Sequence, residues 1–327
     1  MVRRASARAL IALCVGALVA GASASWVLGS QLVRPVNHPV PLPAGFPAQM
    51  VSLPAPGHAI AGWWVNHGSN SPVVLLLHSI RADRSSMLSR AKLLLDHGFS
   101  VLLIDLQGHG ETPGAAITLG MRESADVRTA LEWLKSTAAP SRRIGVIGCS
   151  LGGAAVLLGP RPSGFDAVVL EAVYPRIAGA IENRIRIRLG PLAPVLTPFL
   201  LVQLQPRWHI SRHDLEPIRS VAHLGSPVLV VAGSRDQHTT LAESEELFRA
   251  AVQPKRLWVV NGARHQDFLA FDPTGYGSKS LDSFLNTCGQ AANNRMNVTA
   301  LRAARYRERY APEASTGITR QVWRGRI

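Results

Sequence analysis

The chain has 327 residues, of which 47% are hydrophobic and 17% are charged, and its formal net charge is +14. This composition excludes a disordered chain, and a lone apolar run of near-spanning length excludes a multispan transporter. The last 37 residues carry eight Arg and two Glu, so much of the positive charge lies in a tail. Because no nucleic-acid-binding motif accompanies this charge, we expect no nucleic-acid partner.

The N-terminus is typical of a targeting segment. Arg3, Arg4 and Arg8 precede an apolar stretch over 9–20, and an A-x-A pattern follows at 22–24. These features predict either a secretory signal peptide cleaved near Ala24 or an uncleaved signal anchor over 1–33. Both place the body outside the cytoplasm, and the anchor would hold it at a membrane surface. Residues 34–56 are Pro-rich and are expected to form a linker.

The body alternates short Val/Ile/Leu runs with amphipathic segments. We expect strands at 61–66, 73–77, 101–104, 143–147, 168–170, 228–231 and 257–260. We expect helices at 87–96, 123–135, 241–250 and 279–285, and another that begins at Leu151. Short apolar runs separated by helices predict an α/β domain over 57–286, whose mostly parallel sheet is covered on both faces. The stretch 174–224 interrupts the alternation and is expected to form a helical cap.

A G-x-S-x-G pentapeptide lies at residues 148–152, between a predicted strand and a predicted helix. This context is typical of a nucleophile elbow, in which Ser150 projects its hydroxyl from a strained turn. Gly148 and Gly152 are required because side chains there would collide with the neighbouring strand and helix. The Leu151 N–H lies at a helix N-terminus, where it can stabilise an oxyanion.

A serine nucleophile needs a base and an orienting carboxylate, and in this architecture they follow the serine in the order acid, then His. Asp236 follows the strand at 228–231, and His265 follows the strand at 257–260. Open α/β sheets place their sites at such strand ends. Asp214 and Asp267 are weaker candidates for the acid, since neither directly follows a strand.

His78, the loop Asp105-Leu106-Gln107-Gly108-His109-Gly110, the Ser150 motif and the Asp236/His265 pair occur in this order. With them the chain resembles the α/β-hydrolases over about 51–285, in particular serine hydrolases grouped with prolyl-oligopeptidase-like or monoacylglycerol-lipase-like enzymes. The resemblance implies that the Ile80 N–H is the second oxyanion donor. It also implies a structural role for Asp105 and His109. Ser79 stands where the family has Gly.

These features predict an exported serine hydrolase, a carboxylesterase acting on small-molecule short or medium acyl esters without a cofactor. A serine peptidase or an acyltransferase on the same triad, or a non-catalytic binding protein of this fold, remain alternatives. The apolar positions Ile177, Ile181, Ile185 and Leu189 recur every four residues in the cap. This spacing predicts an amphipathic helix with three alternative roles: it packs on the sheet edge, it covers an acyl pocket, or it lies against a bilayer.

Three further features give weaker signals. Cys149 is interpreted as a buried structural thiol. His209 and His213 are four residues apart but have no third ligand nearby, so we expect no metal. Residues 287–327 are basic and lack hydrophobic periodicity, so we expect a disordered tail that turnover does not need.

Overall fold

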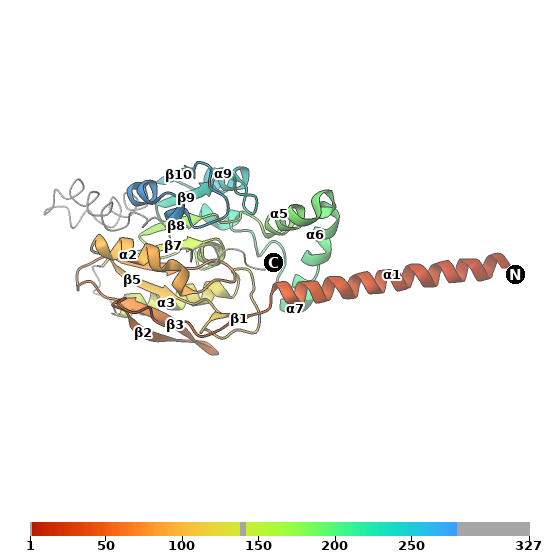
Figure 1. The fold of residues 1–327 in the computed structure, drawn as a ribbon, viewed down its shortest axis with the longest axis horizontal. Coiled ribbons are helices and arrows are strands. Elements are labelled where there is room, and N and C mark those ends of the chain that lie inside the picture. The colour runs from red at the N-terminus through yellow and green to blue at the C-terminus, as the bar shows by residue number, and fades with distance from the viewer. Residues whose placement is uncertain (1, 138–141, 280–327) are drawn as a thin grey trace, which may run out of the picture.

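A computed structural model describes residues 2–137 and 142–279 of the chain. The expected tail over 287–327, and the helix expected at 279–285 beyond Lys279, lie outside these residues. Within them the chain folds around a central sheet, with a long N-terminal helix that projects from one side (Figure 1).

The sheet has eight strands in the order β10-β9-β8-β7-β4-β5-β3-β2. The strands are β2 (Gln49–Ala55), β3 (His58–Val65), β4 (Val73–Leu77), β5 (Ser100–Ile104), β7 (Ile144–Cys149), β8 (Ala167–Glu171), β9 (Val228–Gly233) and β10 (Lys255–Val260). β3 runs antiparallel to β2 and β5, and all other neighbours are parallel. The predicted class, a mostly parallel α/β sheet, is confirmed.

The apolar runs become strands because both faces of the sheet are covered. Every residue of β4 is buried, and its side chains alternate between two separate cores. Leu75 packs with α3 (Glu123–Thr137) and α4 (Leu151–Leu158), whereas Leu76 packs with α2 (Leu88–Asp96) and α10 (Phe268–Phe271). A strand buried on both sides has no polar face, which is why its sequence shows no alternation.

The remaining short elements complete the two layers. α9 (Leu241–Ala250) lies between β9 and β10 in the chain, η1 (Arg84–Met87) precedes α2, and β1 (Val36–Asn37) pairs with β6 (His109–Gly110). α9 begins at a capping box in which Thr240 and Glu243 satisfy each other's backbone N–H groups. This motif explains why the start of α9 matches the predicted residue.

Residues 34–56 differ from the expected linker. They contain β1 and the edge strand β2, which pairs with β3 over seven residues, and the side chains of Val40 and Phe46 are buried. The prolines in this segment hid the strand from the sequence analysis. Pro54 is tolerated in β2 because an edge strand leaves one row of backbone groups without partners.

The expected cap lies between β8 and β9. It contains α5 (Ile177–Leu189), η2 (Gly190–Leu192), α6 (Ala193–Leu201), α7 (Leu204–Trp208) and α8 (Ile218–Val221). α1 (Val2–Leu32) projects from the same side of the body as α5 and α6 (Figure 1). Among the described residues two segments, Ala12–Leu32 and Ile177–Trp208, are long and apolar enough to cross a membrane, so the N-terminal run is not the lone one that the sequence analysis expected.

Candidate active site

The three predicted triad residues follow strands at one edge of the sheet. Ser150 follows β7, Asp236 follows β9 and His265 follows β10, with β8 between the first two. Because these strands are parallel, their carboxyl ends meet at the same edge. The sheet order therefore places at one edge three residues that are up to 115 positions apart in the chain.

Ser150 has the backbone geometry that an elbow requires. Its φ is 47° and its ψ is −104°, directly before α4 begins. A Cβ at Gly148 would lie 2.5 Å from Gly153 N, and one at Gly152 would lie 2.6 Å from Leu77 Cβ. The two glycines thus let α4 approach β7 and β4 closely, and the strained turn is held between them.

Asp236 and His265 form a direct hydrogen bond. The distance between Asp236 Oδ2 and His265 Nδ1 is 2.7 Å, and the aspartate side chain is fully buried. Its other oxygen accepts the backbone N–H groups of His238 at 2.7 Å and Thr239 at 3.0 Å. A carboxylate held in this way favours the His265 tautomer with the proton on Nδ1, which leaves Nε2 free to accept a proton.

The two weaker acid candidates lie in other contacts. Asp214 accepts the backbone N–H of Ser211 at 2.7 Å, and Asp267 pairs with Arg90 at 3.0 Å. Ser150 Oγ makes no hydrogen bond within residues 2–137 and 142–279. In structures without substrate such bonds are often long and tighten only when substrate binds.

The candidate oxyanion donors also lie at strand ends. Leu151 is the first residue of α4, and Ile80 lies in the turn that follows β4. Among the residues that the structure describes, the backbone N–H groups of these two residues have no hydrogen-bond acceptor. Both groups are therefore free to donate to a ligand.

His78 fixes the loop that carries Ile80. Its Nδ1 donates to Ser79 O at 2.8 Å, and its Nε2 accepts the Leu106 N–H at 3.0 Å. Burial lowers the pKa of His78, which keeps the ring neutral and able to make both bonds. The side chain thus acts as a bridge between the loops after β4 and β5.

Asp105 and His109 make contacts of a structural kind. Asp105 accepts the backbone N–H groups of Arg84 at 2.7 Å and Glu111 at 2.9 Å, and it pairs with the Arg84 guanidinium. His109 faces His78 with 5.0 Å between ring centres, and burial lowers its pKa to about 3. These contacts fit the structural role that the resemblance implies.

The sequence analysis missed His238. Its ring centre lies 5.1 Å from that of His265, and its pKa is lowered to about 4, mainly by burial and further by His265 and Arg184. Its backbone oxygen accepts Asn183 Nδ2 of the cap at 3.3 Å. His238 thus lies between α5 and the candidate base. Its position two residues after Asp236 is the sequence feature that could have indicated its place in the site.

The sequence analysis also missed a buried ionic network behind Ser150. Glu171 ends β8, its carboxylate accepts two hydrogen bonds from Arg90, and the Tyr276 hydroxyl donates to it. Arg90 also pairs with Asp267, two residues after His265. The network therefore connects the elbow with the loop of the candidate base.

Cys149 borders this network. Its Sγ lies 3.3 Å from Glu171 Oε2 and 3.8 Å from Met87 Sδ, and burial raises the pKa of the thiol well above its ordinary value. A thiol held in this state is a poor nucleophile, which fits a structural cysteine. His213 pairs with Glu216 at 3.0 Å, and no group of three metal-ligating side chains occurs among the described residues.

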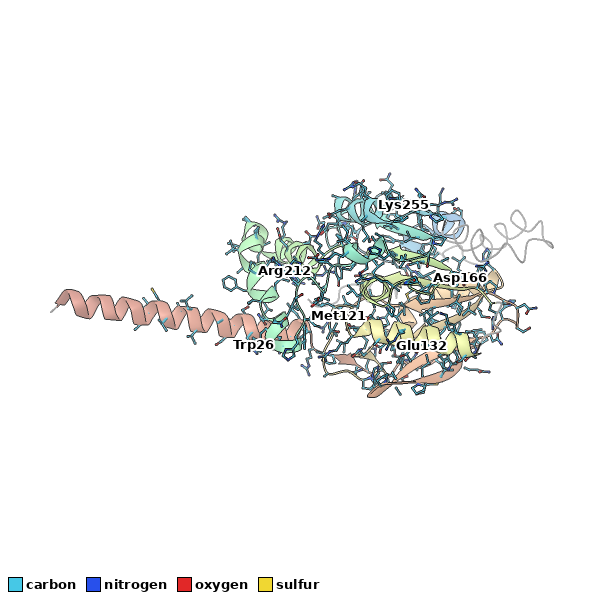
Figure 2. The ribbon with its side chains drawn as sticks, turned by 180° about the vertical axis from the view of Figure 1, so that it is seen from behind. Trp26, Met121, Glu132, Asp166, Arg212 and Lys255 are labelled. Atoms are coloured by element: carbon cyan, nitrogen blue, oxygen red, sulfur yellow. The ribbon has the colours of Figure 1, made fainter. Side chains whose placement is uncertain are left out.

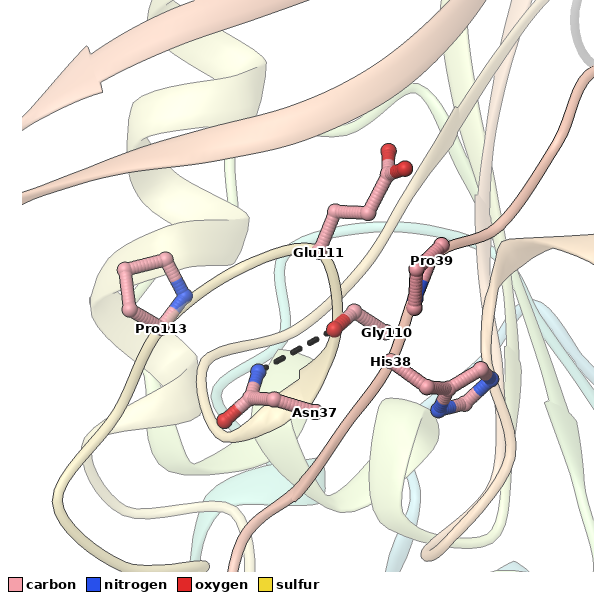
Figure 3. A pocket seen from close by; sticks show the side chains of 6 residues that line it. All are labelled: Asn37, His38, Pro39, Gly110, Glu111 and Pro113. Atoms are coloured by element: carbon pink, nitrogen blue, oxygen red, sulfur yellow. Dashed lines mark hydrogen bonds between the residues drawn. The ribbon is translucent and has the colours of Figure 1, made fainter.

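A surface hollow of about 490 Å³ lies elsewhere (Figure 3). Its lining residues are Asn37, His38, Pro39, Gly110, Glu111 and Pro113. Asn37 Nδ2 donates to Gly110 O at 3.1 Å, where the N-terminal segment crosses the loop after β5. The hollow contains none of the candidate site residues.

Comparison with known proteins identifies the family of the chain. Residues 74–278 match the model of the alpha/beta hydrolase family, and the chain belongs to that family. It is 34% identical to an uncharacterised protein of Mycobacterium tuberculosis over 80% of this chain and 89% of that protein. Family membership supports a hydrolase.

Solved structures show the same fold at lower identity. The Pyrococcus furiosus esterase Pf2001 has 21% identity and a TM-score of 0.64, covering 78% of this chain and all of that one. A puromycin-hydrolysing peptidase of Mycobacterium tuberculosis has 18% identity and a TM-score of 0.57, covering 74% of this chain and 39% of that one.

Proposed function

We propose that the protein is a serine hydrolase, a carboxylesterase that acts on short or medium acyl esters through Ser150, His265 and Asp236. The observation that carries this proposal is the 2.7 Å bond between Asp236 and His265 at the sheet edge where the strained Ser150 lies. A buried acid, an imidazole with one free nitrogen and an elbow hydroxyl make up the machinery for acyl transfer.

The proposed reaction has two stages. His265 Nε2 takes the proton from Ser150 as Oγ attacks the ester carbonyl, and the N–H groups of Leu151 and Ile80 stabilise the resulting oxyanion. The imidazolium, stabilised by Asp236, returns the proton to the leaving alcohol, and an acyl-enzyme forms. Water then enters, gives its proton to His265 and attacks the acyl carbonyl, which releases the acid and restores Ser150.

We place the enzyme outside the cytoplasm, attached to a membrane through α1. The support is the described segment Ala12–Leu32, which has a mean hydropathy of 1.8 and no buried residues. Three arginines precede it, and by the positive-inside rule they stay in the cytoplasm. The catalytic body follows the span and would therefore be exported.

A fluorophosphonate probe tests the nucleophile directly. We expect covalent labelling of the wild-type protein and none of the Ser150→Ala variant, because the probe reacts with an activated serine. Ser136→Ala is the matched control, since Ser136 is exposed on α3, and it should label like the wild type. A panel of p-nitrophenyl esters and peptide anilides then separates esterase from peptidase activity. Labelling that persists in Ser150→Ala would contradict the proposal.

A further inference from the structure

The outer part of the cap exposes a set of large apolar side chains. They lie on the end of α5, on η2, on α6 and at the residue after it. They are Ile187, Leu189, Leu192, Val195, Phe199 and Val202, and each is 44–69% exposed. We call this set the cap face. Large exposed apolar side chains gathered in one part of a domain are typical of a surface that contacts another apolar phase.

Hydrogen bonds join the part of the cap that carries the cap face to α1. Ser25 Oγ donates to Phe199 O at 3.1 Å, and Gln203 Nε2 donates to Ser25 O at 3.0 Å. Arg207 Nη1 donates to Ser30 Oγ at 2.9 Å. The two polar side chains of the cap thus fasten the last turns of α1 to α6 and α7.

Two features show that this contact is close. The Arg207 guanidinium lies 3.7 Å from the centre of the Trp26 ring, a stacked cation–π geometry. A Cβ at Gly29 would lie 2.2 Å from Gln203 Oε1, so a larger residue there would displace the Gln203 side chain that bonds Ser25. α1 and the outer cap are therefore packed against each other, and they project from the same side of the domain (Figures 1 and 2).

The position of the contact along α1 sets the depth of the cap face. The apolar segment of α1 ends at Leu32, and Ser25 lies seven residues before that end. At 1.5 Å per residue the distance along the helix axis is about 10 Å. Phe199, which bonds Ser25, is therefore level with a point inside the apolar segment. A bilayer that encloses this part of α1 would therefore have Phe199 at the depth of its apolar layer.

The charges around the cap face fit a lipid headgroup layer. Arg186 and Arg188 are exposed on the last turn of α5, next to Ile187 and Leu189. Arginines beside an apolar face extend toward headgroups while their stems stay in the apolar layer. Trp26, which is 44% exposed, has the amphipathic ring that is enriched at this boundary.

We propose that the cap face docks in the outer leaflet of the lipid bilayer that α1 crosses, as a second attachment about 5–10 Å deep. The occupant of the surface is lipid, and α1 and α6 enter it side by side. Asn183, on the same α5, bonds the His238 backbone next to the candidate base, so the cap reaches from the bilayer to the site. If the proposed esterase function holds, acyl substrates enter from the leaflet.

Fluorescence labelling of the full-length chain tests the docking. In a background with Cys14→Ser and Cys288→Ser, Val195→Cys carries an environment-sensitive nitrobenzoxadiazole dye. Val252→Cys is the matched control: Val252 has the same side chain, is 60% exposed against 63% for Val195, and lies beyond α9, outside the cap face. The background alone serves as the blank for Cys149, which is only partly exposed and whose thiol has a raised pKa, so we expect little labelling there.

In phosphatidylcholine vesicles we expect blue-shifted emission at position 195 and at least threefold stronger quenching by doxyl-labelled lipids than at position 252. Twenty per cent phosphatidylglycerol should increase the difference, since the arginines favour anionic headgroups. Equal quenching at both positions would overturn the proposal. So would a signal that appears only at high protein-to-lipid ratio, because it would show that a second copy covers the face.

A hydrolysis assay tests substrate entry from the leaflet separately from the docking itself. Val195→Asp should lower turnover of an ester dissolved in vesicles at least fivefold and leave turnover of p-nitrophenyl acetate within twofold, whereas Val252→Asp should leave both unchanged. Equal turnover of the vesicle ester by both variants would contradict entry from the leaflet. If no ester is hydrolysed, the esterase proposal fails, and the dye measurement still decides the docking.

Discussion

Arg90 donates two hydrogen bonds to the carboxylate of Glu171, at 3.0 and 2.6 Å, and both side chains are almost fully buried. The backbone oxygen of Glu171 accepts the Ser150 N–H at 2.8 Å, and Arg90 also holds Asp267 close to His265. One ion pair thus supports two of the three proposed catalytic residues from behind. Breaking it would leave a buried charge without its main partner.

We expect Glu171→Gln to destabilise the fold by about 3 kcal/mol, because the Arg90 guanidinium would lose its buried carboxylate partner. For a domain of this size the melting temperature should fall by roughly 6–12 °C. Tyr276→Phe is a milder comparison, since it removes one hydrogen bond to the same carboxylate and should cost about 1 kcal/mol. Thermal melts of the detergent-solubilised proteins measure both, and an unchanged midpoint for Glu171→Gln would refute the role of the pair.

Ser150→Ala and His265→Ala should each lower kcat by about 10³-fold or more, and the double variant should be hardly worse than either. Triad members act as a unit, so their losses do not add. Asp236→Asn should cost a similar amount or less, because it favours the wrong His265 tautomer. Steady-state ester hydrolysis measures these rates, and strictly multiplicative losses in the double variant would argue against a shared step.

Acid should destabilise the protein through His238. Its pKa is about 4 in the fold and about 6.5 in the unfolded chain, so between these values the unfolded state binds more protons. Stability therefore falls as the pH drops from 6.5 towards 4. At pH 5 the contribution of this partly exposed group, discounted for solvent screening, is about 1 kcal/mol.

Urea midpoints at pH 7.5 and pH 5 measure the effect. His238→Gln should reduce the difference in unfolding free energy between pH 7.5 and pH 5 by about 1 kcal/mol. His67→Gln is the matched control, because His67 is exposed in the loop after β3, and it should leave the difference unchanged. The same narrowing in both variants would rule out a specific role for His238.

If α5 lines an acyl site, kcat/KM should rise with acyl length until the site is full. Each buried methylene contributes about 0.8 kcal/mol, or roughly fourfold, so extension from two to six carbons gives on the order of 200-fold. The double variant Ile181→Ser/Ile185→Ser should flatten this gradient and leave acetate esters nearly unchanged. Both side chains are partly buried, whereas the control Ile187→Ser lies on the exposed cap face. Equal losses at every chain length would assign the two isoleucines to stability.

Strands such as β4 and helices such as α9 are readable from the sequence because local signals define them. A continuous Val/Leu run marks a strand buried on both faces, and a Thr–Glu capping box marks the start of a helix. The Ser150 motif and the Asp236/His265 pair were found because each follows a strand. These signals require no knowledge of which residues meet across the fold.

The features that were missed depend on long-range contacts. Arg90 and Glu171 are 81 positions apart, and neither stands in a motif. β2 was hidden because the prolines of residues 34–56 are typical of linkers, while its pairing with β3 depends on tertiary structure. The attachment of α1 to Gln203 and Arg207 likewise joins residues almost 180 positions apart.

The residues that fasten α1 to the cap begin at Ser25, directly after the A-x-A pattern that ends at Ala24. Cleavage at that point would remove most of the membrane span and leave Ser25, Trp26 and Ser30 in place on α6 and α7. The released enzyme would keep its cap contacts and its exposed cap face, with the new amino terminus beside Phe199. Processing would then convert a permanently anchored protein into one that binds membranes reversibly, without any change in the catalytic body.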